Sequence, residues 1–214
     1  MVMAEYTVYG FAQSGNSYKP ALYLELAGAD WRPRFVDFFN GETRTPAYRE
    51  INVMGEVPVL EHKGQRLSQS GAILDYLIEQ LGKFGWKDDT ERREVLRWLL
   101  WDNHKLTSYT ATYRFLNKLV SNADPVVLAE FRKRSEASWK ILDKHLAGRS
   151  HVVGERLTIA DISICGYLFF EDDLGVDWNQ YPNIRDWLAR IRSVPGWKHP
   201  YDLLPGHPLP ARAA

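Results

Sequence analysis

The stretch SGNSYKP, residues 14–20, brings hydroxyl, amide and amine side chains close together near the start of this 214-residue chain. It lies between a strand-like apolar run, YTVYGF, and a helix-like run, ALYLELAG. Ser and Asn are preferred residues at a helix N-terminus, and the free N–H groups of a helix start bind anions. The stretch therefore predicts a helix start at which Ser14 and Asn16 act as caps, as contacts to an anion, or as both.

Composition narrows the class of protein. Twenty-seven Lys and Arg residues balance 27 Asp and Glu residues, so no net field attracts nucleic acid or an acidic membrane. The longest uncharged apolar run, residues 162–170, is far shorter than the roughly 20 residues that span a bilayer. The first residues carry an acid where a signal peptide carries basic charge, and the single cysteine, Cys165, cannot form an internal disulfide or a Cys-rich metal site. We expect a folded cytoplasmic protein with no metal and no membrane or nucleic-acid partner.

The first 82 residues alternate in type. A strand-like run, a helix, the strand-like RPRFVDFF and VPVLEHKGQRL, and a second helix follow one another, and Lys63-Gly64 is a hairpin signal. The helix from Ser70 has apolar side chains on one face and Gly82 at its expected end. This order predicts a βαβ unit, then an antiparallel hairpin and a helix that packs on the sheet.

The rest of the chain has helical spacing only. Residues 82–90 are rich in Gly and charge and predict a linker. Helical periodicity then runs through residues 91–120, 125–146 and 184–194. Thr158 and Asp161 have the spacing of a capping box before a helix that is apolar nearly all round, which predicts a buried helix. The proline-rich residues 201–214 predict an irregular strap over the surface.

Together, these units and motifs resemble the cytosolic glutathione transferases. The likeness is carried by SGNSYKP, GEVPVL (residues 55–60), SQSGAILDYL (68–77) and GERLTIADISI (154–164), and it covers essentially the whole chain. Each motif is weak alone, but their order and spacing are specific. The resemblance implies an α+β, thioredoxin-like N-terminal domain (βαβ-α-ββα) over residues 1–82 and an all-α C-terminal domain over residues 91–214. It also implies glutathione as co-substrate and a homodimer.

Ser14 stands where serine-type members of this family place the hydroxyl that donates to the glutathione sulfur. Only the thiolate is a good nucleophile, and a free cysteine thiol has a pKa of about 8.5. Lowering that pKa by about two units needs roughly 2.7 kcal/mol. One charge-assisted hydrogen bond (about 1.5–3 kcal/mol) and a helix N-terminus (about 0.3–1 kcal/mol) supply this.

Asn16 keeps a second assignment open. Nu-like bacterial members that resemble disulfide-bond reductases have Thr-Pro-Asn at this turn, where Thr and Asn share the contact to sulfur, and SGN is similar to that motif. Ser14 and Asn16 could also only cap the helix. Ser17, at a position where glutaredoxin-like members have cysteine, and Tyr9, at a position where other classes use a tyrosine, are weaker candidates.

The same resemblance implies a groove for the tripeptide. Val57-Pro58 matches the cis-proline pair of the thioredoxin-like fold, beside which the cysteinyl backbone of glutathione pairs like an added strand. Gln69 and Ser70 begin the next helix and would bind the γ-glutamyl carboxylate. Candidates for the glycine carboxylate are Arg44 first, then Lys19 and His62.

The second substrate would lie against the first long helices of the C-terminal domain. The expected lining residues are Tyr109, Tyr113 and Trp101, although aromatic residues at helical spacing are more often core. Tyr109 and Tyr113 are the better candidates because their hydroxyls need water or a polar ligand.

The leading hypothesis is a glutathione transferase that conjugates the glutathione thiolate to a hydrophobic electrophile. The first alternative is a nu-like glutathione-dependent peroxidase or disulfide-bond reductase. The second is a non-catalytic binding protein with the same fold, which the intact GEVPVL and Gln69-Ser70 motifs disfavour.

Overall fold

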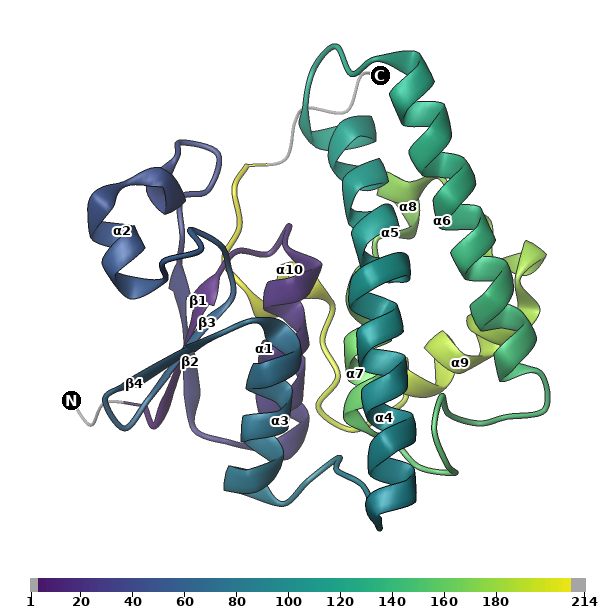
Figure 1. Ribbon diagram of the computed structural model, residues 1–214, viewed down its shortest axis with the longest axis horizontal. Helices are drawn as coiled ribbons and strands as arrows, with labels where there is room; N and C mark the ends of the chain where they lie inside the picture. Colours follow the sequence, from purple (N-terminus) through teal and green to yellow (C-terminus); the bar gives the residue numbers. More distant parts are fainter. Residues whose placement is uncertain (1–3, 209–214) are drawn as a thin grey trace. The chain divides into compact units, whose positions relative to one another are not determined.

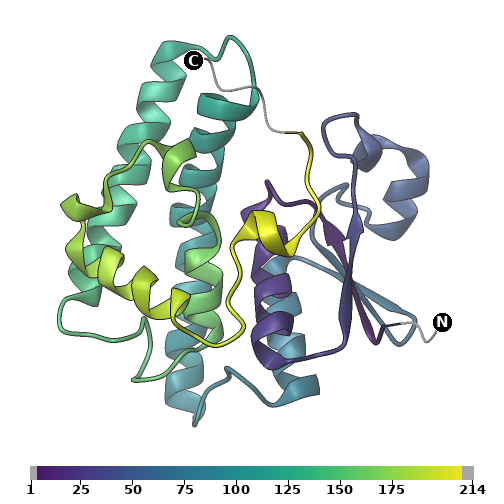
Figure 2. The ribbon, with the colours of Figure 1, turned by 180° about the vertical axis from the view of Figure 1, so that it is seen from behind.

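The computed structural model describes residues 4–208 and divides by its contacts into two compact units (Figure 1). The first unit comprises Met1–Gly85 together with Val194–Ala214, and the second comprises Trp86–Ser193. The sequence pattern assigns residues 91–214 to the all-α C-terminal domain. In the structure, α10 (Pro200–Leu203) packs instead against α1 (Gly15–Ala27), so the C-terminal segment belongs by its contacts to the first unit, as Figure 2 shows.

A four-stranded sheet of order β2-β1-β3-β4 forms the centre of the first unit. Its strands are β1 (Tyr6–Gly10), β2 (Trp31–Phe35), β3 (Val59–His62) and β4 (Gln65–Ser68). β1 is parallel to β2 and antiparallel to β3, and β3 is antiparallel to β4. Lys63 and Gly64 form the hairpin turn, both at positive φ, as a two-residue turn of this kind requires. The predicted βαβ start and hairpin are confirmed.

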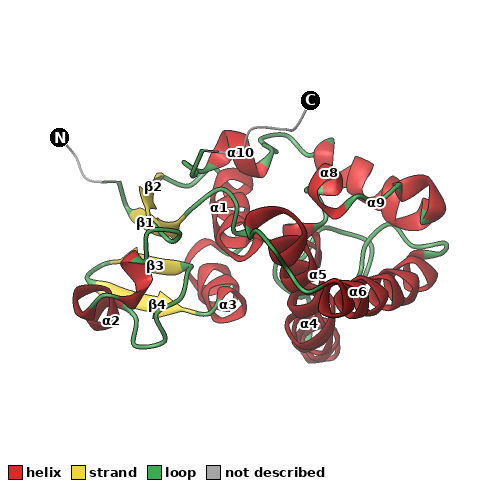
Figure 3. Ribbon diagram, turned by 90° about the horizontal axis from the view of Figure 1, so that it is seen from above, coloured by secondary structure: helices red, strands yellow, loops and turns green. Residues whose placement is uncertain are grey.

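Helices cover both faces of this sheet. They are α1, α2 (Pro46–Ile51) and α3 (Ser70–Leu81), with a short 3-10 segment, Glu42–Arg44, before α2. Figure 3 shows α1 and α3 side by side on one face and α2 on the other. α3 ends at Gly82 in the left-handed conformation, as the sequence predicts.

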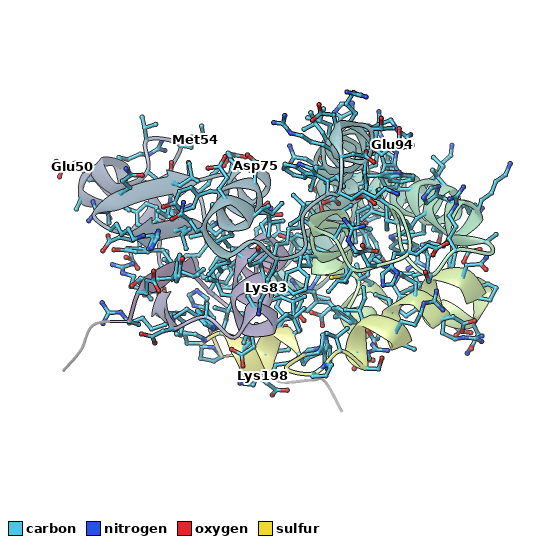
Figure 4. The ribbon with its side chains drawn as sticks, turned by 90° about the horizontal axis from the view of Figure 1, so that it is seen from below. Glu50, Met54, Asp75, Lys83, Glu94 and Lys198 are labelled. Atoms are coloured by element: carbon cyan, nitrogen blue, oxygen red, sulfur yellow. The ribbon has the colours of Figure 1, made fainter. Side chains whose placement is uncertain are left out.

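α1 begins earlier than the sequence pattern indicates, at Gly15, so most of SGNSYKP is helical. Pro20 lies inside this helix, where it cannot donate to the carbonyl of Asn16. The other end of α1 is held by two lysines labelled in Figure 4: Lys83 Nζ donates to the carbonyl of Ala27 at 2.7 Å, and Lys198 Nζ lies 2.6 Å from a Glu25 carboxylate oxygen. Cations near the C-terminus of a helix stabilise it.

All the secondary-structure elements of the second unit are helical, and they are joined by loops. Its α-helices are α4 (Asp89–Trp101), α5 (Thr107–Arg114), α6 (Pro125–Leu146), α7 (Ile159–Ile164), α8 (Glu171–Leu174) and α9 (Pro182–Arg192). α5 and α6 run side by side (Figure 1). The segments Asp102–Leu106 and Phe115–Leu119 are π-helical and lie within the helical region predicted over residues 91–120.

The capping box is confirmed at the start of α7. Thr158 N donates to Asp161 Oδ2 at 2.9 Å, and the Thr158 side chain accepts from Ala160 N. The other oxygen of Asp161 accepts from Val152 N and from Trp187 Nε1 of α9, both at 2.9 Å. All of α7 is buried, as predicted, so its start is fixed by protein groups rather than by water. None of the described helices has the length and apolar character needed to cross a membrane.

Candidate functional site

Strand register brings three of the predicted segments to one end of the sheet. Tyr9 of β1 pairs with Val59 of β3, and Val59 pairs with Ser68 of β4. β1 therefore leaves the sheet toward the start of α1 at the same end at which Val57-Pro58 enters β3 and β4 leads into α3. All of these segments lie in the first unit.

Ser14 is the N-cap residue of α1, and only 7% of it is exposed. Its Oγ accepts a hydrogen bond from Ser17 N at 3.2 Å, which satisfies one of the free N–H groups of the first turn. A hydroxyl has one proton and two lone pairs, so accepting this bond leaves the proton of Ser14 able to donate. Capping and a contact to sulfur are therefore compatible roles for Ser14.

Asn16 is in the first turn of the same helix. Its Oδ1 is buried and accepts no hydrogen bond from any residue that the structure describes. The N–H groups of Gly15 and Asn16 also precede the first intrahelical bond, which runs from Tyr18 N to the carbonyl of Ser14. The turn therefore presents two helix N–H groups beside the Ser14 hydroxyl, which is a suitable environment for an anion. Asn16 Oδ1 is an acceptor and adds nothing to the binding of an anion.

The two weaker candidates, Ser17 and Tyr9, lie in different surroundings. Ser17 is fully buried, and its Oγ lies so close to Gly10 that a Cβ at that glycine would be 2.4 Å away. Tyr9 lies on the opposite face of the sheet, in a cluster with Tyr48 of α2. Its hydroxyl donates to Glu61 at 2.9 Å, and burial together with this bond raises the pKa of Tyr9. Ser17 Oγ has no hydrogen-bond partner among the described residues, whereas the Tyr9 hydroxyl is bound to Glu61.

The Val57-Pro58 peptide bond is cis, which confirms that prediction. At the start of α3, Gln69 has φ of 69° and ψ of 112°, and no side chain caps the helix. Its Nε2 donates to a Glu56 carboxylate oxygen and lies 3.1 Å from Met54 Sδ. An uncapped start of a twelve-residue helix at Ser70 can hold a carboxylate. The sequence did not single out Glu56, because a lone acid beside the proline motif carries no periodic signal.

Of the three cations suggested for the glycine carboxylate, only Arg44 is exposed. Lys19 is 1% exposed within α1. His62 is a buried core residue: its ring stacks on Tyr6, Nδ1 lies 2.7 Å from the hydroxyl of Tyr76 and Nε2 lies 3.2 Å from Glu5. The structure therefore contradicts a carboxylate-binding role for His62.

The three aromatic residues predicted to line a hydrophobic pocket all belong to the second unit. Tyr113 is buried and accepts from Arg132 Nη1 at 3.2 Å, and Tyr109 accepts from Lys105 Nζ at 3.3 Å. Trp101 is half-buried with its ring edge-on to Trp98. The tyrosine hydroxyls already have protein partners, so the argument that they need a ligand does not hold. Within residues 4–208, no group of three or more His, Cys, Asp or Glu side chains is placed to hold a metal.

A four-stranded sheet with this order, a cis-proline beside its third strand and an appended helical unit define the glutathione S-transferase fold. Family models match the chain as the glutathione S-transferase N-terminal domain over residues 4–79 and C-terminal domain over residues 125–190. The chain belongs to the glutathione S-transferase family.

Individual relatives point to more than one chemistry. The chain is 30% identical over 192 residues to the disulfide-bond oxidoreductase YfcG of Escherichia coli, which covers 86% of this chain and 89% of the relative. It is 32% identical, with a TM-score of 0.85, to the structure of a possible glutathione S-transferase from Rhodopseudomonas palustris, covering 92% of this chain and 98% of the other. A glutathione transferase homologue from Lodderomyces elongisporus, with two glutathione molecules per subunit, shares the fold at a TM-score of 0.87 and 21% identity over 95% of this chain and 100% of the other.

Proposed function

We propose that this protein is a glutathione transferase in which the bound glutathione thiolate attacks an electrophilic carbon of a hydrophobic acceptor. The observation that carries the proposal is the geometry of Ser14: its oxygen caps α1 while its proton is left to donate. In the proposed complex this proton and the N–H groups of Gly15 and Asn16 stabilise the sulfur anion. The leaving group of the acceptor departs with the electron pair as the carbon–sulfur bond forms.

The rest of the tripeptide follows the same end of the sheet. Its cysteinyl backbone would pair with Val57, its γ-glutamyl carboxylate would sit at Gln69 and Ser70, and Arg44 would meet the glycine carboxylate. The register that gathers the segments of Val57 and Gln69 supports the placement of the first two groups. The homologue from Lodderomyces elongisporus, which holds glutathione, has the same fold.

A second candidate is glutathione-dependent disulfide reduction, favoured by the 30% identity to the E. coli disulfide-bond oxidoreductase. The bound thiolate would attack one sulfur of the substrate disulfide and release the other as a thiolate. A second glutathione thiolate would then attack the mixed disulfide, giving oxidised glutathione and the second substrate thiol. Two glutathione molecules are needed because Cys165 is fully buried and cannot act as a nucleophile.

Replacement of Ser14 and Asn16 tests both candidates. For Ser14→Ala we expect the pKa of bound glutathione, followed by thiolate absorbance, to return toward the free value of about 8.5. Turnover of an aromatic halide should fall by about a hundredfold or more, as when one oxyanion donor is removed. The exposed Ser121→Ala is the matched control and should behave as the wild type.

Turnover of a mixed disulfide that depends on Asn16, with no turnover of the halide, would support the reductase instead. A wild-type protein that binds glutathione without lowering its thiol pKa would overturn both candidates. We further infer that the protein works as a homodimer in the cytoplasm, where a reduced glutathione pool is maintained.

A further inference from the structure

The C-terminal segment returns to the segment that positions Ser14. α10 packs on α1, and the hydroxyl of Tyr18 donates to the carbonyl of Lys198 at 2.7 Å. Beyond α10, the chain continues past the connection between β1 and α1. It follows that residues 195–208 are a structural part of the thioredoxin-like unit.

Three hydrogen bonds join this segment to the two residues that precede Ser14. Ala12 N donates to the carbonyl of Pro205 at 2.9 Å. The side-chain amide of Gln13 bonds to His207 in both directions: Nε2 donates to the carbonyl at 2.7 Å, and Oε1 accepts from the backbone N–H at 3.1 Å. Only 3% of Gln13 is exposed, and the two residues are 194 positions apart in the chain. The Gln13 side chain therefore makes the pair of hydrogen bonds to His207 that a backbone segment would otherwise make, and it links the two segments.

Close packing restricts the contact between the C-terminal segment and the residues before Ser14. A Cβ at Gly206 would lie 2.9 Å from both the Ala12 methyl group and Gln13 Oε1. The ring of His207 contacts the rings of Phe11 and Phe39, with centroids 5.4 and 4.5 Å away. Bonds and packing thus act together on the residues immediately before the start of α1.

We propose that Gln13 is a positioning residue: by binding the backbone of His207, it holds the β1–α1 connection so that the Ser14 hydroxyl is directed at the glutathione sulfur. Gln13 itself touches no substrate. Ser14 itself is bonded through its N–H to the carbonyl of Phe11 at 3.0 Å, through its carbonyl to Tyr18 N at 3.0 Å and through its Oγ to Ser17 N at 3.2 Å. A hydroxyl that must meet one atom of a ligand gains from a backbone fixed on both sides. This inference rests on the proposed function.

The test compares Gln13→Ala with Gln80→Ala, an exposed glutamine at the end of α3. For Gln13→Ala we expect the pKa of bound glutathione to rise by about one unit, which is a tenfold loss of thiolate at a pH below both values. We expect kcat to fall by about tenfold while the KM for glutathione changes by less than about twofold, since the groove residues are untouched. Gln80→Ala should match the wild type in all three measurements.

A second variant separates positioning from folding. Gln13→Glu keeps the side-chain volume and the acceptor for His207 N–H but places a carboxylate oxygen against the carbonyl of His207, so it should raise the thiol pKa in the same direction. If Gln13→Ala does not fold, as judged by circular dichroism, the measurements on Gln13→Glu decide the test. A folded Gln13 variant with the wild-type thiol pKa and kcat overturns the inference. If the wild type itself does not lower the thiol pKa, the proposed function fails instead, so the two failures are distinguishable.

Discussion

At the scale of single residues, the role proposed for Ser14 joins a structural and a chemical task in one side chain. A cap needs an acceptor, whereas a thiolate needs a donor, and a hydroxyl offers both. Alanine at this position would remove the cap as well as the proposed donor, and a lost cap costs about 1 kcal/mol. The folding effect of Ser14→Ala must therefore be measured beside its catalytic effect, and Asn16, which caps nothing in the described structure, gives the cleaner chemical comparison.

Gln69 carries a conformation that its type disfavours, with φ of 69°. Strain of this kind costs about 1–3 kcal/mol and collects at functional sites. Glycine has no Cβ to clash there, so for Gln69→Gly we expect the free energy of unfolding to rise by about 1 kcal/mol. Glutathione affinity should fall by about threefold to tenfold, because one hydrogen bond of about 1 kcal/mol is lost. Urea denaturation and calorimetric titration measure the two effects.

Gln80→Gly provides the matched comparison. Gln80 lies in the last turn of α3. Here the same substitution should lower the free energy of unfolding, because glycine is about 1 kcal/mol worse than other residues in a helix. Equal destabilisation by both substitutions would show that Gln69 is not strained in the folded protein.

At the scale of elements, the start of α4 is fastened to the loop before α7 by one carboxylate. Glu91 accepts from Arg156 at both oxygens, at 2.9 and 2.7 Å, and from Lys87 N at 2.6 Å. Glycine is needed at position 154 beside this carboxylate, because a Cβ there would lie only 2.6 Å from Glu91 Oε1. The Arg156 guanidinium lowers the pKa of Glu91 from its ordinary 4.5 to about 2.

The Glu91 carboxylate makes the free energy of unfolding depend on pH in the acid range. Because the folded pKa of Glu91 is below the unfolded one, its contribution is complete above pH 4.5 and is lost as the pH falls toward about 2. Arg156 is half-exposed, so solvent screens the pair and we expect about 1–2 kcal/mol. Glu91→Gln should be less stable than the wild type at neutral pH and approach it near the acid limit. Urea midpoints across this pH range measure the difference.

The exposed Glu79→Gln is the control for that titration. It removes one carboxylate from α3 without touching an ion pair that the structure describes, so its effect on the urea midpoint should be small and nearly constant with pH. A constant deficit for Glu91→Gln over the whole range would mean that the Arg156 contact contributes no charge-dependent stability.

Sequence patterns predicted the elements whose cause is local and missed those whose cause is distant. The hairpin at Lys63-Gly64, the end of α3 at Gly82 and the capping box at Thr158 each follow from a few adjacent residues, and the structure confirms them. The π-helical turn from Asp102 was not predicted; the buried Asp102 carboxylate at its start accepts from the nearby Thr107 and from Ser163, which is 61 positions away. A period of 3.6 residues carries no information about such a partner.

The candidate site residues also divide into those that a local motif predicts and those whose roles depend on distant partners. Val57-Pro58 and the start of α3 were identified from motifs, whereas the roles of Tyr9 and His62 depended on which face of the sheet they occupy and on partners in other strands and helices. Gln13 gave no signal, because its partner His207 lies near the other end of the chain. A glutamine beside a serine has no distinctive spacing, so only the folded structure links it to the site.

At the scale of the whole molecule, the thioredoxin-like unit is discontinuous in sequence. Its sheet and helices come from the first 85 residues, and it is completed by the segment from Val194 onward, which includes the buried Leu203 and Leu204. The helical unit is therefore an insertion in the chain between two parts of the other unit. The packing of the thioredoxin-like unit therefore includes residues that lie far from its sheet in the sequence.

This arrangement predicts which unit each core residue stabilises. Leu204→Ala, near the C-terminus, and Leu188→Ala in α9 remove the same atoms from buried sites, and each should cost about 2–5 kcal/mol. For Leu204→Ala we expect faster amide hydrogen exchange in β1 and α1, because the lost packing belongs to the first unit. For Leu188→Ala we expect faster exchange in α6, against which α9 packs. Exchange measured by mass spectrometry on the two full-length variants separates these outcomes. If Leu204→Ala loosened α6 and left β1 and α1 protected, the C-terminal segment would belong with the helical unit.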